Sequence, residues 1–169
     1  MSLSFVTKPT EEEKKIRKLK YNIFVNGKVN SEGTGTFETG SWAFLVVDIN
    51  ENKTVIDAKE ENTNELRIEL TGIIESLKWI SNHTEQKYKK FVQITLHTSS
   101  IYCYNLLNEW IELWTKDETI SQRPNSDLLQ QVYKYKKVMN ITPKLTYKVS
   151  NEHAWLVDRK VNEKLNLHI

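Results

Sequence analysis

Two pairs of polar side chains have the spacing that places both members on one face of a helix. Glu65 lies four residues before Glu69, and Asp158 lies four residues before Asn162. Residues four apart in a helix are neighbours on its surface, one turn from each other. Carboxylate oxygens are the ligands that Mg²⁺ and Mn²⁺ prefer. The carboxylates of these pairs are therefore the first residues to consider for metal chemistry.

A second group of side chains has the charge needed to bind a phosphate backbone. Residues 121–169 carry nine basic and four acidic residues, whereas residues 21–120 carry nine basic and fifteen acidic ones. The basic third contains lysines with interleaved tyrosines, namely Lys134, Lys136 and Lys137 with Tyr133 and Tyr135, followed by Lys144 and Lys148. Basic groups near aromatic rings are typical of nucleic-acid-binding surfaces. A solvated helix face would show the same pattern, and the sequence leaves both interpretations open.

Three further residues could have chemical or binding roles. Cys103 is the single cysteine, which excludes an internal disulfide and a cysteine-based zinc site. It has no accompanying catalytic motif, so we expect a small buried side chain. Trp110 and Trp114 lie four apart within an acidic segment, which disfavours a role in gripping a nucleic acid. We expect them to be core residues or anchors that face a protein partner.

The segments that must position these residues alternate between strand and helix patterns. Apolar and β-branched runs predict strands, helical spacing of apolar residues predicts helices, and Thr63 or Asn64 can cap the first long helix. The expected order is strands at 21–25, 41–48 and 53–60, a helix at 64–81, a strand at 91–96, helices at 100–107, 109–114 and 125–140, a strand at 145–149 and a helix from 150 or 151 to 165.

Length and composition predict one folded domain. The chain has 169 residues, with 24 Lys and Arg against 22 Asp and Glu. We expect a charged N-terminal tail over 1–19 and a single domain over 20–169. No apolar run approaches the roughly 20 residues that span a bilayer, and the start lacks a signal pattern. Together with the lone cysteine, this predicts an intracellular, cytoplasmic protein.

This order of segments, with several local motifs, resembles the ribonuclease H type 1 family over about residues 20–165. The motifs are Phe24-Val25-Asn26-Gly27, Arg67-Ile68-Glu69-Leu70, Thr98-Ser99-Ser100, Ser126-Asp127-Leu128-Leu129, and His153 followed nine residues later by Asn162. The resemblance implies an α/β fold of the RNase H type. Its five-stranded mixed sheet would have the order 3-2-1-4-5, with helices on both faces.

The same resemblance implies a metal-dependent nuclease, in which four carboxylates hold two divalent ions that activate water. The four corresponding positions here are Asn26, Glu69, Ser99 and Asn162, so only Glu69 keeps a carboxylate. The family also implies that His153 shuttles protons, whereas a polar residue at the start of a helix needs no such role. With most of the anionic ligands missing, we expect at most a weak metal site, built from Glu69 and Asp158 with Glu65 nearby.

Three functions are compatible with these residues. The first is a catalytically degenerate RNase H-like module that needs no cofactor and is a scaffold either for binding nucleic acid, through Lys134, Lys136, Lys137 and Lys148, or for docking a protein partner. The second is an active ribonuclease H that uses Mg²⁺ or Mn²⁺ with a rearranged carboxylate set to cut the RNA of RNA/DNA hybrids. The third is a docking subunit that meets a protein assembly through the Trp110 and Trp114 face. None of the three involves a membrane, and we favour the first because of the carboxylate count.

Overall fold

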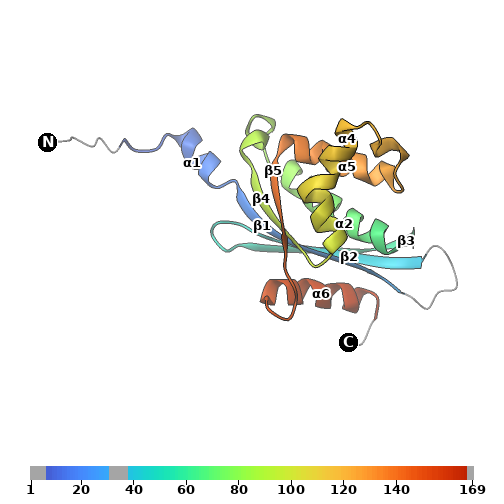
Figure 1. Ribbon diagram of the computed structural model, residues 1–169. Coiled ribbons are helices and arrows are strands. Elements are labelled where there is room, and N and C mark those ends of the chain that lie inside the picture. Colours follow the sequence, from blue (N-terminus) through green and yellow to red (C-terminus); the bar gives the residue numbers. More distant parts are fainter. Residues whose placement is uncertain (1–6, 31–37, 167–169) are drawn as a thin grey trace.

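One five-stranded mixed sheet organises the chain (Figure 1). The computed structural model describes residues 7–30 and 38–166. Its strands are β1 (Lys20–Val29), β2 (Glu38–Val47), β3 (Lys53–Thr63), β4 (Gln93–Thr98) and β5 (Asn140–Leu145). Their order is β3-β2-β1-β4-β5; β2 is antiparallel to β1 and β3, and β4 is parallel to β1 and β5. The predicted order is confirmed.

Helices cover both faces of this sheet, as predicted. The helices α2 (Glu65–Asn82) and α5 (Ser126–Val138) lie over one face, and α6 (Glu152–Lys164) lies over the other (Figure 1). Alternate residues of a strand point to opposite faces. Accordingly, Ile23, Val25, Trp42, Phe44 and Val46 pack with α2, whereas Phe24, Ala43, Leu45 and Val47 pack with α6.

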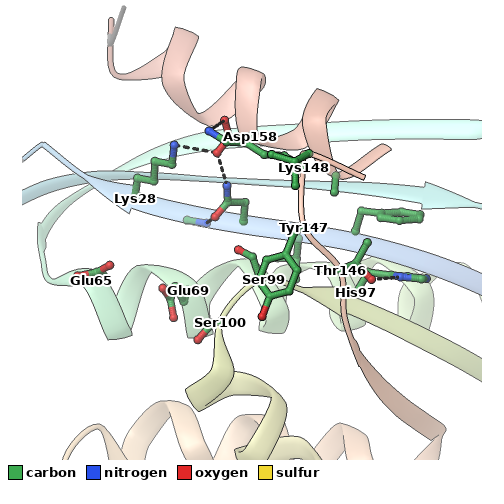
Figure 2. A pocket seen from close by; sticks show the side chains of 16 residues that line it. Lys28, Glu65, Glu69, His97, Ser99, Ser100, Thr146, Tyr147, Lys148 and Asp158 are labelled. Atoms are coloured by element: carbon green, nitrogen blue, oxygen red, sulfur yellow. Dashed lines mark hydrogen bonds and ion pairs between the residues drawn. The ribbon is translucent and has the colours of Figure 1, made fainter. Parts of the chain in front are cut away.

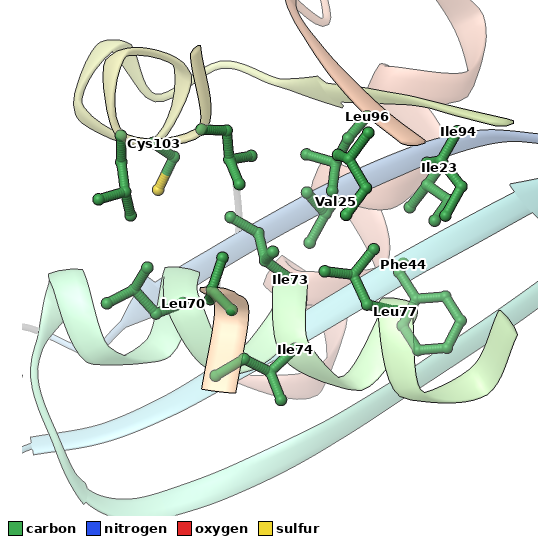
Figure 3. Close-up of a cluster of buried hydrophobic side chains, with 14 of the residues drawn as sticks. Ile23, Val25, Phe44, Leu70, Ile73, Ile74, Leu77, Ile94, Leu96 and Cys103 are labelled. Atoms are coloured by element: carbon green, nitrogen blue, oxygen red, sulfur yellow. The ribbon is translucent and has the colours of Figure 1, made fainter. Parts of the chain in front are cut away.

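The long helix α2 supplies much of the larger core. It begins where the Asn64 side chain accepts a hydrogen bond from the backbone N–H of Arg67 at 3.0 Å. Capping of this kind satisfies a backbone donor that the first turn leaves free. Buried apolar side chains at helical spacing, among them Leu70, Ile73, Ile74 and Leu77, then join the core that also contains Leu96 of β4 (Figure 3). The helix ends at Asn82, close to its predicted end.

A single bent helical stretch follows β4, where we predicted two separate helices. It consists of α3 (Ile101–Asn105), the π-helical η2 (Leu106–Trp110) and α4 (Ile111–Lys116). Ser100 caps its start by accepting from the backbone N–H of Cys103 at 3.1 Å, and Cys103 is buried as expected. A π-turn widens the helix by one residue per turn, which a search for 3.6-residue spacing registers as an interruption.

The segments outside the sheet layers are short. Two 3₁₀ turns, η1 (Gln86–Phe91) and η3 (Ile120–Gln122), connect larger elements. The predicted tail over 1–19 lies partly outside the described residues, and its described part contains α1 (Glu11–Arg17), a helix with no buried residue. Of the helices in the described part of the chain, none has the length and apolar character to cross a membrane.

Two strands extend differently from our predictions. We expected Asn26-Gly27 to close β1, but the strand continues through both residues to Val29, paired with β2. We placed the last strand at 145–149, but β5 ends at Leu145. Pro143 lies inside β5, which is an edge strand, where a missing N–H is tolerated. Lys148 therefore belongs to the following turn and does not share a strand face with Lys144.

Candidate functional site

A cleft of about 650 Å³ opens where β1, β4 and β5 meet α2 and α6. The predicted positions Asn26, Glu69 and Ser99 all line it, and so does Asp158 (Figure 2). The ends of the parallel strands β4 and β5 supply further lining residues, namely His97, Ser100, Thr146, Tyr147, Lys148 and Val149. Ligands in open α/β sheets bind outside such strand ends. The cleft is therefore the first candidate for a functional site.

Gly27 sets the distance between β1 and α2 at this cleft. A Cβ at position 27 would lie 3.0 Å from the backbone carbonyl of Ile68 and 3.1 Å from the backbone nitrogen of Glu69. Contacts that short force the neighbouring atoms apart, so the close approach requires a glycine. The approach brings the start of α2, which carries Glu65 and Glu69, beside Asn26 on the strand.

Asp158 is the centre of a five-residue cluster that joins α6 to β1 and to the turn after β5; Figure 2 shows Asp158, Lys28 and Lys148. Its Oδ1 accepts from the Asn26 amide at 3.0 Å and pairs with the Lys28 ammonium at 2.7 Å. Its Oδ2 accepts from Lys148 at 3.2 Å and from the Asn162 amide at 3.1 Å. A carboxylate offers about four acceptor sites, and here four donors use them. We call Asp158, Asn26, Lys28, Lys148 and Asn162 the Asp158 cluster.

The amide oxygens of the Asp158 cluster are also engaged. Asn162 Oδ1 accepts from the Lys28 ammonium at 2.9 Å, and Asn26 Oδ1 accepts from the backbone N–H of Gly27 at 2.8 Å. Asn162 does not line the cleft itself but lies directly behind Lys28 and Asp158. Sequence reasoning missed Lys28. Its position could have indicated it, because Lys28 lies two residues after Asn26 on a strand, which places both side chains on the same face.

The two buried or half-buried carboxylates of the cleft have opposite pKa shifts. Burial by itself raises the pKa of Asp158, but hydrogen bonds and charge from Lys28 and Lys148 outweigh it and lower the pKa overall. Burial raises the pKa of Glu69, and partial offsets come from the Ser100 hydroxyl and the Cys103 thiol, whose sulfur is 3.5 Å from Glu69 Oε2. Glu69 is thus a carboxylate without a positively charged partner among the described residues.

Two histidines flank the cleft on an aromatic stack. The His97 ring lies 4.1 Å from Phe24, nearly parallel to it, and His153 lies 5.0 Å from the same ring at a steep angle. His97 also contacts Thr146 Oγ1 through Nδ1 at 2.7 Å and Asn22 Oδ1 through Nε2 at 2.9 Å. Burial, with the charges of Lys144 and His153, lowers the pKa of His97 to about 4. His153 stands in the first turn of α6, where Asn151 caps the helix.

The predicted nucleic-acid-binding lysines fall on two surfaces. Lys148 lines the cleft, whereas Lys134 and Lys137 line a separate hollow of about 300 Å³ beside Tyr133 on α5. The Lys137 ammonium lies 5.2 Å from the Tyr133 ring centre. We call Lys134, Lys137 and Tyr133 the α5 basic surface. Lys136 turns away from it and forms an ion pair with Glu112 of α4.

The Trp110 and Trp114 rings stack on each other with centres 5.8 Å apart. Tyr102 contacts Trp110 edge-on at 5.4 Å, and the Arg123 guanidinium lies 4.3 Å from the Trp114 ring centre. Both tryptophans are partly buried against the larger core. Their contacts with neighbouring side chains within the chain account for much of this face, and its use by a protein partner stays a prediction.

Comparison with known proteins places the chain in a family. A family model described as RNase H matches residues 19–153. The chain belongs to the RNase H family. Its relatives include the ribonuclease H of Caldanaerobacter subterraneus subsp. tengcongensis, 31% identical over 136 residues that cover 77% of this chain and 83% of the relative. The ribonuclease H of Caldicellulosiruptor saccharolyticus is 32% identical over 107 residues, which cover 60% and 68%.

Solved structures of RNase H proteins share the fold. LC9-RNase H1, described as a type 1 RNase H with the type 2 active-site motif, superposes with a TM-score of 0.73 at 13% identity, covering 85% of this chain and 71% of that one. LC11-RNase H1 in complex with an RNA/DNA hybrid superposes with a TM-score of 0.61 at 11% identity, covering 86% and 99%. The resemblance that the sequence motifs indicated is confirmed.

The residues of the cleft do not fit the two divalent ions that the family resemblance implies. Among residues 7–30 and 38–166, no three His, Cys, Asp or Glu side chains are grouped so that they could hold a metal ion. The acceptor sites of Asp158 are used by four donors, and the Asn26 and Asn162 oxygens each accept a hydrogen bond. Mg²⁺ gives up its own waters reluctantly and needs free anionic oxygens, and Glu69 and Glu65 are the carboxylates that remain. The structure does not bring Glu69 and Asp158 together into such a group.

Proposed function

We propose that this chain is a non-cleaving member of the RNase H family that binds nucleic acid, with an RNA/DNA hybrid as the first ligand to test. The observation that carries the proposal is the Asp158 cluster. Two ammonium groups, of Lys28 and Lys148, and two neutral amides surround the Asp158 carboxylate. Two adjacent dications require several anionic ligands, so this donor set disfavours two-metal hydrolysis.

Retention of nucleic-acid binding is supported by the fold and by basic residues at two places. A structural neighbour, LC11-RNase H1, has been solved with an RNA/DNA hybrid. Here Lys28 and Lys148 line the cleft, and Lys134 and Lys137 form the α5 basic surface. Ammonium groups bind phosphates irrespective of base sequence. We therefore expect binding with little sequence preference, in the cytoplasmic compartment that the sequence predicts.

Cleavage and binding must be measured on the same samples. A labelled RNA/DNA hybrid is incubated with the chain in Mg²⁺ or Mn²⁺, the products are resolved on a gel, and binding is followed by fluorescence anisotropy across a salt series. We expect an intact RNA strand and an affinity that falls steeply as salt rises, because phosphate contacts release bound counterions. The Lys134→Glu/Lys137→Glu variant is expected to bind more weakly, with Lys53→Glu/Lys59→Glu at exposed positions of β3 as the matched control.

Two results would contradict the proposal. Metal-dependent cleavage that Glu69→Gln abolishes would show an active ribonuclease H with a rearranged set of ligands. An absence of binding at low salt would remove the nucleic-acid ligand and leave a docking role for the Trp110 and Trp114 face.

A further inference from the structure

The Lys28 ammonium occupies a position inside the cleft that is defined by two oxygens. It lies 2.7 Å from Asp158 Oδ1 and 2.9 Å from Asn162 Oδ1. Lys148 approaches the other oxygen of the same carboxylate, Oδ2, at 3.2 Å. Both lysine side chains line the cleft and remain partly exposed, 28% for Lys28 and 44% for Lys148, whereas that of Asp158 is 11% exposed. The carboxylate is therefore covered by two cations that still face the opening (Figure 2).

Sequence spacing explains why this position is fixed. Asn26 and Lys28 are two apart on β1 and point to the α6 side of the sheet, and Asp158 and Asn162 are four apart on α6 and share one helix face. Each pair contacts the other through the bonds of the Asp158 cluster. The contacts between the two β1 residues and the two α6 residues thus fix the position of the Lys28 nitrogen. Such preorganisation lowers the ordering cost of binding a ligand.

The two ammonium groups retain hydrogen-bonding capacity. Each carries three N–H donors. Lys28 donates one hydrogen bond, to Asn162, and pairs with Asp158, and Lys148 donates one hydrogen bond to Asp158. The two positive charges also exceed the single negative charge of Asp158, so this wall of the cleft has a formal charge of +1. The Asn26 and Ser99 side chains line the same cleft and add polar groups. A ligand group with charged oxygens matches these features.

We propose that Lys28 is a resident cation of the cleft and that Lys28 and Lys148 together bind a phosphodiester group directly, without a divalent metal. This inference rests on the proposed nucleic-acid-binding function and adds the site and its metal independence. Lysine binds phosphate as a point charge through its ammonium donors. The opposite wall carries Glu65 and Glu69, which repel a phosphate. That repulsion sets the orientation: the phosphodiester lies on the Lys28 and Lys148 side of the cleft.

Anisotropy measurements with a labelled RNA/DNA hybrid at constant ionic strength test the inference. In the wild-type chain, we expect the same affinity with EDTA as with Mg²⁺. The Lys148→Gln variant leaves Lys28 on Asp158 and is expected to weaken binding and to lower the slope of log affinity against log salt by about 1, the loss of one phosphate contact. Lys28→Arg keeps the charge and is expected to bind better than Lys28→Gln. Lys53→Gln, on the exposed start of β3, is the matched control and should leave the slope unchanged.

Removing a charge from the wall that carries Glu65 and Glu69 is expected to change the affinity in the opposite direction. Removing a negative charge with Glu65→Gln is expected to strengthen binding, because a phosphate in the cleft then meets less repulsion. A metal-bridged complex would instead lose affinity in this variant and in EDTA, and either loss would overturn the inference. So would wild-type binding that Lys148→Gln leaves unaltered in strength and slope. No binding by the wild-type chain at low salt is a different result, which overturns the proposed function and with it the inference. Thermal unfolding of each variant verifies that it is folded.

Discussion

Asp158 accepts one hydrogen bond on Oδ1 and two on Oδ2, and Oδ1 also pairs with the Lys28 ammonium, so that its partners come from three parts of the chain. Asp158 is 8% exposed, and the Lys28 side chain beside it is 28% exposed. A covered ion pair with complete hydrogen bonding is costly to break from one side, because the remaining charge stays without a partner. At the scale of single residues, we therefore expect Asp158 to contribute more to stability than any exposed ion pair does.

The first prediction concerns that dependence. Asp158→Ala is expected to lower the free energy of unfolding by about 3 kcal/mol, since it leaves Lys28 without its ion-pair partner and two amides without their acceptor. Urea unfolding followed by circular dichroism measures the change. Glu163→Ala on the same helix is the matched control, because its partner Arg159 is exposed, and we expect a loss below about 1 kcal/mol. Equal losses in the two variants would mean that the Asp158 cluster adds no stability.

The second prediction concerns His97. The neutral ring has one N–H and one bare nitrogen. The Asn22 amide oxygen at Nε2 can accept from the N–H, and the Thr146 hydroxyl at Nδ1 can donate to the bare nitrogen. Its pKa, lowered to about 4, lies below the ordinary value of 6.5. As the pH falls below 6.5, the His97 imidazole therefore takes up a proton in the unfolded chain, whereas it stays neutral in the folded chain. Stability from this group is complete above pH 6.5 and decreases as the pH falls towards 4. The loss is on the order of 1–3 kcal/mol.

An NMR titration of the imidazole signals tests this directly, with the other histidines in the same spectra as internal references. We expect the His97 ring to remain neutral at pH 5.5. A midpoint near 6.5 would show that the stack on Phe24 and the neighbouring Lys144 do not oppose its protonation.

At the scale of elements, Gly27 determines how closely α2 approaches β1. The third prediction is that Gly27→Ala destabilises the chain by about 1–3 kcal/mol, because the added methyl group meets the Ile68 carbonyl at 3.0 Å. It should also separate Glu69 from Asn26. Chemical denaturation gives the stability change, and Lys59→Ala on the exposed side of β3 is the control, with an expected change below about 0.5 kcal/mol. An Ala variant as stable as the wild-type chain would show that α2 can shift without cost.

The elements also show what a single sequence can predict. The order of strands followed from local motifs, and the α2 helix from apolar spacing with an Asn64 cap. The ends of β1 and β5 did not follow, because Asn26-Gly27 and Pro143 are turn signals in isolation, while pairing with β2 and β4 overrides them here. The Lys28–Asp158 contact joins residues 130 positions apart, so only the folded arrangement reveals it. The sequence indicated which carboxylates are missing, but not the Lys28 ammonium group that pairs with Asp158.

At the scale of the whole molecule, charge is divided between distinct surfaces. The cleft has the Asp158 cluster on one wall and Glu65 and Glu69 on the other, and the α5 basic surface lies elsewhere. A nucleic acid that contacts both the cleft and the α5 basic surface would gain binding free energy from each of them. Each contribution is electrostatic and weak, and each depends on the salt concentration. On the proposed function, the family fold would position the lysines of both surfaces for binding.

A Mn²⁺ titration shows whether the cation of this cleft is the chain's own ammonium group. Free Mn²⁺ is measured by electron paramagnetic resonance, in the wild-type chain and in a variant that combines Asn26→Asp, Ser99→Asp and Asn162→Asp with Lys28→Ala. We expect the wild-type chain to leave the Mn²⁺ free and the variant to bind it, and we expect restoring Lys28 in the variant to weaken this binding. Two tightly bound ions per wild-type chain, with affinity equal to that of the variant, would contradict the account.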